Sequence, residues 1–171
     1  MNEQIRFLTQ RRSVRSFTDE AVCAEARDQI LQAGLYAPSA MNRQVWQFTV
    51  VTGQALKALG DAVAEALDSP NYSRFYSAPM LIITSYPRAH SLGREDCSCA
   101  MENMLLAAHA LDLGAVWINQ LVDTCDHPTV RKLLDDFGVP GDHLCGGCVA
   151  VGHSAAPAPA AKAINGKVVI V

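Results

Sequence analysis

The longest apolar segment of the chain, REDCSCAMENMLLAAHALDLG at residues 94–114, constrains the fold more than any other feature. Its spacing predicts a helix from about Arg94 to Leu113, closed by Gly114, because glycine readily adopts the left-handed backbone found after a helix. Small residues and methionines make this helix apolar on most sides. Such a helix lies in a core or in a subunit interface, so it needs a partner face to cover it.

Shorter segments on both sides of this helix alternate between helical and strand patterns. Helices are predicted near residues 5–10, 24–37, 56–67 and 126–138, and strands at 46–51, 80–86, 115–119 and 148–152. Pro38 ends the second helix, because the residue before a proline avoids the helical region. These elements indicate an α+β fold of packed layers around a central sheet of about five strands.

The end of the chain differs in character from the rest. An extended Ala/Pro stretch leads to KVVIV at residues 167–171, a predicted strand with no hairpin partner nearby in the sequence. This strand must join either its own sheet or a partner's. We therefore expect one domain over residues 1–171, with a core at 1–155 and an extended arm at 156–171.

The overall charge and hydropathy exclude some classes of function. The chain has 171 residues and a formal net charge of -3, whereas a general nucleic-acid binder needs a basic face. No apolar run approaches the roughly 18–20 residues of a membrane span. The first residues lack the apolar core of a signal peptide. The expectation is a cytoplasmic protein that binds neither nucleic acid nor membrane.

The segment QRRSVRSFTD, residues 10–19, gathers three arginines in an otherwise mildly acidic chain. Arg11, Arg12 and Arg15 repel one another unless they share an anion, and arginine forks match phosphate oxygens in bidentate pairs. Ser13 adds a hydroxyl donor. On these residues alone, a solvated cluster of surface charge explains the segment equally well.

A second polar segment, APSAMNRQVWQF at residues 37–48, lies between a predicted helix and a predicted strand. Ser39, Asn42 and Gln44 offer neutral hydrogen-bonding groups beside Trp46, and such groups suit the ring edge of a flavin. The alternative is an ordinary capped turn with Trp46 in the core.

Taken together, these segments resemble the FMN-dependent nitroreductase family. RRSVRSF is followed by AGLYAPSAMNRQVWQFTVV, then by DCSCAMENMLLAAHALDLGAVWI, and finally by VAVGH with prolines and Lys162. The resemblance spans nearly the whole chain in the expected order. It implies three layers with a mostly antiparallel sheet, and a homodimer with two FMN molecules at its interface, in which the C-terminal strand joins the partner's sheet.

The resemblance also assigns residues to the cofactor. The arginine segment grips the FMN phosphate, the 38–44 loop lines the flavin from the partner subunit, and three further segments complete the site. The implied cofactor-binding residues are Arg11, Arg12, Ser13, Arg15, Pro38, Ser39, Ala40, Met41, Asn42, Gln44, Asn71, Arg74, Trp117, Ile118, Asn119 and Lys162.

The activity implied is that of an NAD(P)H-dependent oxidoreductase. NADH or NADPH delivers a hydride to flavin N5 and leaves, and a small electron-poor acceptor such as a nitroaromatic or a quinone then takes its place. Arg15 or Arg74 supplies positive charge at the N1/O2 edge. No side chain acts as a nucleophile or an obligate base.

Two other functions compete with this interpretation. The first is a protein that stores or senses FMN without catalysis. The second is a metal or thiol-redox site, because Cys145 and Cys148 have CxxC spacing and Cys97 and Cys99 form a second pair. Free cysteines are also common in cores, and a second CxxC is missing.

Overall fold

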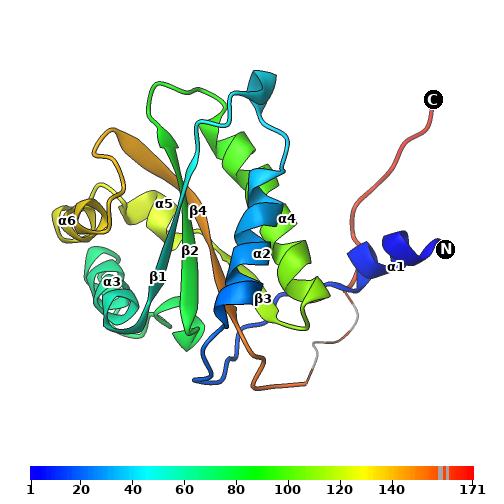
Figure 1. The fold of residues 1–171 in the computed structure, drawn as a ribbon, viewed down its shortest axis with the longest axis horizontal. Helices are drawn as coiled ribbons and strands as arrows, with labels where there is room; N and C mark the ends of the chain where they lie inside the picture. The colour runs from blue at the N-terminus through cyan, green and yellow to red at the C-terminus, as the bar shows by residue number, and fades with distance from the viewer. Residues whose placement is uncertain (158–159, 161) are drawn as a thin grey trace.

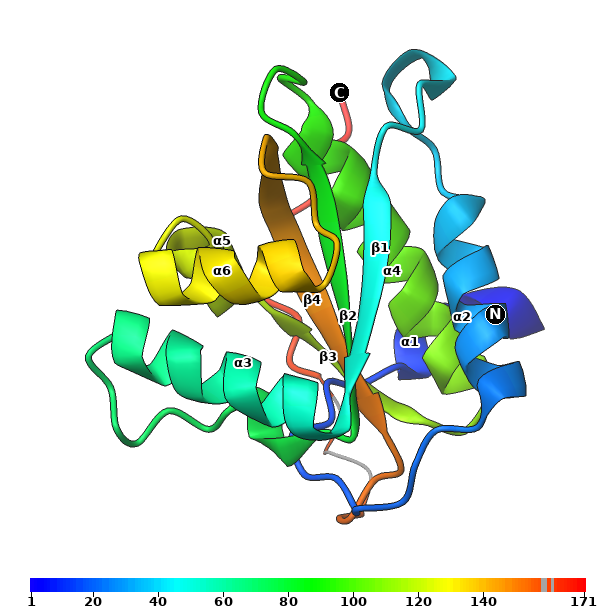
Figure 2. The same cartoon turned by 60° about the vertical axis from the view of Figure 1, so that its left-hand side comes forward.

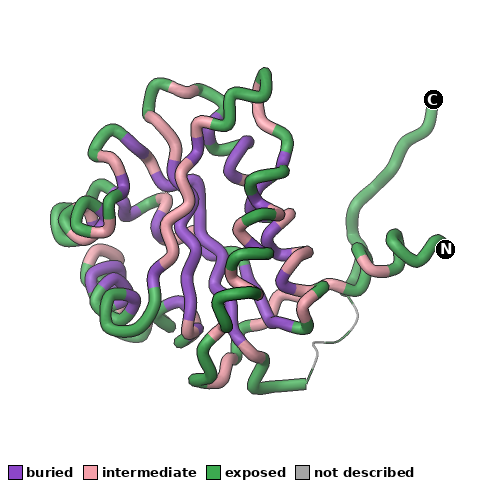
Figure 3. Tube along the Cα trace, viewed as in Figure 1, coloured by how far each residue is buried: buried purple, intermediate pink, exposed green. Residues whose placement is uncertain are grey.

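One antiparallel sheet of four strands organises the computed structural model, which describes residues 1–157, 160 and 162–171. The strand order is β1-β2-β4-β3, with β2 and β4 in the middle (Figure 1). The strands are β1 (Gln47–Thr52), β2 (Met80–Pro87), β3 (Gly114–Ile118) and β4 (His143–Gly152). The two central strands are the most buried part of the chain (Figure 3).

Helices cover both faces of the sheet, so the structure has three layers (Figures 1 and 2). One face packs α3 (Gly53–Ala66), α5 (Gln120–Thr124) and α6 (Pro128–Asp136). The other face packs α2 (Ala24–Leu35) and α4 (Gly93–Ala110). A separate helix, α1 (Glu3–Gln10), lies outside these layers.

Two glycines allow α4 to approach its neighbours closely. A Cβ on Gly146 would lie 2.4 Å from the Cβ of Cys97 on α4, and a Cβ on Gly34 of α2 would lie 2.3 Å from Cε of Met104. Gly146 is also the extra residue of a β-bulge, because Thr84 pairs with Gly147 and Ser85 with Cys145. The long helix is therefore seated on the sheet where β4 has no side chain to hold it away.

Both ends of the chain lie apart from this core (Figure 1). Helix α1 buries none of its residues, and Ile5 and Leu8 are half exposed. The end of the arm is extended and pairs with no strand among the described residues. Its large aliphatic side chains are 81–118% exposed over Val168–Val171.

The α+β class with a mostly antiparallel sheet is confirmed, and so are the order and type of the predicted helices and strands up to residue 152. The strand predicted at 167–171 is wrong for the single chain, because these residues form no strand in the structure. The long helix α4 ends at Ala110 rather than near Leu113, and Gly114 begins β3 instead of closing the helix. The second helix ends at Leu35 rather than near residue 37, ahead of Pro38. Helix α5 was not predicted, and β4 begins five residues earlier than expected. The sheet has four strands rather than about five, because residues 167–171 add none to it. In the described ranges, no helix is both long enough and apolar enough to cross a membrane.

Candidate functional site

Main-chain hydrogen bonds hold the arginine segment against the sheet. The Val14 amide donates to the Ala115 carbonyl of β3 (3.0 Å), and the Thr18 amide donates to the carbonyl of His153 (2.9 Å). In return, the Ala155 amide donates to the Ser16 carbonyl (3.0 Å). These bonds fix the backbone of residues 13–18. The backbone of Ser13 and of its arginine neighbours therefore has a defined position whether or not their side chains contact a ligand.

Arg11 has a buried donor atom without a hydrogen-bond partner. Its side chain is 20% exposed, its Nε lies 3.7 Å from a carboxylate oxygen of Glu102, and its buried Nη1 has no hydrogen-bond partner. The residue lines a cavity of about 160 Å³ together with Arg12, His109 and Ser154. A buried guanidinium nitrogen without a partner is costly, so this site favours an anion that accepts from it.

Arg12 is instead largely satisfied within the chain. Its Nη1 donates to the carbonyls of Thr9 (2.8 Å) and Arg11 (2.9 Å), and its Nε donates to the carbonyl of Ala160 in the arm (3.2 Å). Arg12 therefore joins α1 to the C-terminal arm. Lys162, two residues farther along the arm, is exposed.

Arg15 connects the arginine segment to an unusual turn. Its guanidinium carbon lies 5.9 Å from the ring centroid of Tyr76, at cation–π range. Tyr76 belongs to four consecutive left-handed residues, Arg74–Ser77, with φ between 44° and 60°. Non-glycine residues rarely adopt this conformation, and it concentrates at functional sites. No glycine marks this turn in the sequence, and Tyr76 was not among the predicted site residues.

Arg74 is the first residue of this turn and Asn71 lies three residues before it, and the two side chains differ in their contacts. The Arg74 Nε is 2.5 Å from Asp61 Oδ1 on α3, and its Nη1 donates to the Tyr72 carbonyl. Asn71 is exposed in the loop after α3. Arg74 also lines a larger cavity, of about 880 Å³, between the first turns of α2 and α3 and the start of β2. Arg74 is the only predicted site residue among those that line this larger cavity.

The next predicted segment, residues 117–119, lies at the end of β3, the edge strand that also pairs with the arginine segment. Trp117 is 36% exposed and Ile118 is buried. The Asn119 side chain accepts a long hydrogen bond from Arg94 Nη2 at the start of α4 (3.4 Å). β3 thus carries both the pairing partner of the arginine segment, at Ala115, and the exposed Trp117.

The 38–44 loop lies elsewhere. It follows the end of α2, whereas the arginine segment precedes the start of that helix, and the two segments occupy opposite ends of the molecule in both views (Figures 1 and 2). One chain therefore does not bring together all the predicted site residues. Pro38, Ser39, Ala40, Met41, Asn42 and Gln44 are separated from the arginines.

Four of the six cysteines lie in the core and two lie at the surface. All six are free: Cys23 and Cys99 are exposed, and Cys97, Cys125, Cys145 and Cys148 are buried. A hydrogen bond from the Cys145 thiol lowers the pKa of Cys125 to about 6 despite burial, and the same bond helps to raise the pKa of Cys145. Among the residues that the structure describes, no group of three or more potential metal ligands could hold an ion.

Comparisons with known proteins identify the family and the fold of the chain. The model of the Nitroreductase family matches residues 8–153. A crystal structure of a nitroreductase with bound FMN from Bacteroides fragilis NCTC 9343 aligns with a TM-score of 0.91 and 38% identity over 100% of both chains. A protein of Archaeoglobus fulgidus, provisionally named NADH dehydrogenase/NAD(P)H nitroreductase, is 32% identical over 90% of this chain and 86% of its own length. The FMN reductase (NAD(P)H) of Bacillus subtilis is 54% identical over 54 residues, which are 32% of this chain and 21% of that protein.

The burial of the cysteines predicts how the native chain reacts with a thiol reagent. No more than two thiols, those of Cys23 and Cys99, should be modified quickly, because the other four are shielded by packing. Unfolding in guanidinium should expose all six. Peptide mass spectrometry after timed alkylation identifies the modified positions. Rapid modification of Cys125 in the native chain would contradict the structure and favour a thiol-redox role.

Proposed function

The chain belongs to the nitroreductase family, and from this premise we propose how its residues serve an NAD(P)H-dependent flavin oxidoreductase. The bound FMN of the Bacteroides fragilis relative and the names of the other relatives establish the class as FMN-dependent oxidoreductases. When bound, FMN accepts a hydride from NAD(P)H at N5 and passes it to a small electron-poor acceptor. The assignments of this chain's residues below are our proposal.

The single observation that supports a phosphate site here is the partnerless Nη1 of Arg11. The phosphate group of FMN carries the acceptor oxygens and the charge that this buried donor needs. Ser13, with its backbone fixed against β3, adds a hydroxyl donor, and Arg12 places further positive charge on the arm side. Lys162 is exposed and lies two residues beyond Ala160, the arm residue that Arg12 contacts. The residues present therefore fit the cofactor.

Arg15 is the better candidate for positive charge at the N1/O2 edge of the flavin. Arg74 is already paired with Asp61, whereas Arg15 lies over the ring of Tyr76 in the left-handed turn. Trp117, Ile118 and Asn119 at the end of β3, and Asn71 beside the turn, complete the surface that orients the ring. None of these side chains is required to form a covalent bond with the substrate.

The complete site requires a second copy of the chain. The 38–44 loop follows the end of α2, whereas the arginine segment precedes its start. Pro38, Ser39, Ala40, Met41, Asn42 and Gln44 would therefore reach a flavin held by the partner's arginines. The exposed face of α1 and the exposed residues 162–171 suit such an interface. We propose a homodimer with two FMN molecules, in which residues 1–155 form the core and the arm joins the partner's sheet.

The cytoplasm is the compartment that fits this function. NAD(P)H is the electron donor, and all six cysteines of the chain are free, as in a reducing environment.

The phosphate assignment predicts a specific loss of cofactor in one variant. Arg11→Gln removes a charge-assisted contact and should raise the dissociation constant for FMN about thirtyfold, or about 2 kcal/mol. Flavin fluorescence quenching during titration of the apoprotein measures it. Lys132→Gln, which removes a charge from the exposed face of α6, serves as the control. Equal affinity of both variants would refute the assignment.

Steady-state kinetics separate the enzyme from a protein that only stores FMN. We expect parallel lines in double-reciprocal plots when NAD(P)H and a nitroaromatic or quinone acceptor are varied, because donor and acceptor use one site in turn. Without acceptor and without oxygen, NAD(P)H should bleach the yellow absorption of the bound flavin. Tight FMN binding without bleaching by NADH or NADPH would support storage or sensing instead.

Removal of the last five residues tests the dimer. A chain that ends at residue 166 retains Lys162 but loses the exposed Val168–Val171. Because burial of these aliphatic side chains stabilises association, the dimer dissociation constant should rise at least about tenfold. Light scattering over a dilution series measures it, with Lys167→Gln in the full chain as the control. An unchanged dimer would show that the arm does not join the partner's sheet.

A further inference from the structure

A buried carboxylate at the start of α4 reaches the 38–44 loop. Asp96 is 6% exposed, and its Oδ1 accepts a hydrogen bond from the Ala40 amide at 2.8 Å, across 56 positions of sequence. Its other oxygen, Oδ2, lies 2.8 Å from Nε2 of His90. The side chains of His90 and Asp96 are 9% and 8% exposed, so both polar groups are satisfied within the protein rather than by bulk water.

The loop that Asp96 contacts adopts an unfavourable backbone. Met41, Asn42 and Gln44 have φ values of 51°, 53° and 50°, in the left-handed region that favours glycine. Inside the loop, the Asn42 amide donates to the Ser39 carbonyl (2.9 Å), and the Gln44 amide donates to Ser39 Oγ (3.1 Å). These short-range bonds shape the loop but do not attach it to the rest of the protein. A strained loop persists only where its surroundings hold it.

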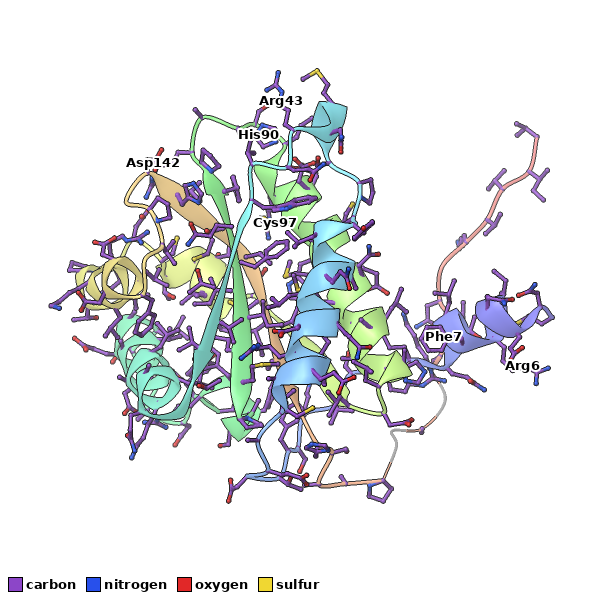
Figure 4. All side chains as sticks on the ribbon, viewed as in Figure 1. Arg6, Phe7, Arg43, His90, Cys97 and Asp142 are labelled. Atoms are coloured by element: carbon purple, nitrogen blue, oxygen red, sulfur yellow. The ribbon has the colours of Figure 1, made fainter. Side chains whose placement is uncertain are left out.

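The loop is attached to α4 at three points. At its two ends, Ala37 and Trp46 pack in a small apolar cluster with Cys97 and Ala100 of α4. Between these ends, the Asp96–Ala40 hydrogen bond ties the loop to the same helix. Figure 4 shows His90 and Arg43 at the same end of the molecule. His90 and Asp96 are buried and joined to the loop through Ala40, whereas residues 41–44 of the loop are exposed.

We propose that Asp96, oriented by His90, is a positioning residue that holds the 38–44 loop in the conformation with which it contacts the flavin of the partner subunit. The role follows from chemistry: a carboxylate can accept from the Ala40 amide and from the His90 N–H at the same time. A loop held in place before FMN arrives does not have to be ordered during binding, which strengthens binding. The proposal rests on the proposed function, because it assumes that this loop lines the flavin.

The first test needs no cofactor. Arg43 is exposed in the loop and is a site for trypsin, so the rate at which fragment 1–43 appears from the apoprotein reports how often the loop opens. Asp96→Ala should speed this cleavage about tenfold, which corresponds to 1.4 kcal/mol. Glu95→Ala, its exposed neighbour on α4, is the matched control and should cleave at the wild-type rate. Asp96→Asn keeps an oxygen that accepts from Ala40 and should stay within about threefold of wild type.

The second test measures FMN affinity of the same four proteins by fluorescence titration. Asp96→Ala should raise the FMN dissociation constant about tenfold, and Asp96→Asn should restore most of the affinity, which a general loss of stability would not explain. If Asp96→Ala does not fold, His90→Ala replaces it. This variant should also speed tryptic cleavage and raise the FMN dissociation constant, both by less than Asp96→Ala.

The outcomes separate this inference from the proposed function. If the wild-type protein binds no FMN, the proposed function fails and the positioning role fails with it, whatever trypsin shows. If the wild type binds FMN but Asp96→Ala changes only one of the two measurements, or neither, the proposed function stands and the positioning role is refuted. Faster cleavage together with weaker FMN binding, both reversed in Asp96→Asn, supports it.

Discussion

The close contact between α4 and the sheet is the constraint on which the site depends. At Gly146 the strand offers no side chain, and the helix lies directly against the bulge of β4. From that fixed position, the first turn of α4 reaches the 38–44 loop through Asp96, and the end of the helix leads into β3, which pairs with the arginine segment. An 18-residue helix is about 27 Å long, so it separates these two halves of the predicted site within one chain. The length of this helix supports the proposal that the site is shared between two chains.

The arginines show why charge in a sequence does not translate directly into a binding role. In the sequence, Arg11 and Arg12 are equivalent neighbours. In the structure, the Arg12 side chain donates hydrogen bonds to three main-chain carbonyls, whereas Arg11 has a buried nitrogen without a partner. Arg15 and Arg74 differ in the same way, because Arg74 is paired with Asp61. The folded chain thus separates arginines that stabilise the protein from arginines that can bind an anion.

The sequence predicted the regular elements well because their causes are local. Apolar periodicity located the helices and strands, and Pro38 marked the end of α2 within a few residues. Features with distant causes could not be predicted. The left-handed turn at Arg74–Ser77 contains no glycine, and the link between Asp96 and Ala40 joins residues that only the fold brings together. The sequence therefore located the candidate segments, but not which side chains remain free to bind.

The exposed end of the arm, Val168–Val171, affects how a single chain aggregates. Val168–Val171 is a short uncharged run of β-branched residues, almost fully open to water, and such runs stack readily on one another. If the arm joins a partner's sheet as proposed, dimer formation competes with aggregation in every newly synthesised chain. Lys167, just ahead of the run, places a charge that opposes indiscriminate stacking. In the proposed homodimer, the yield of protein made at high level would therefore depend on how quickly two copies associate.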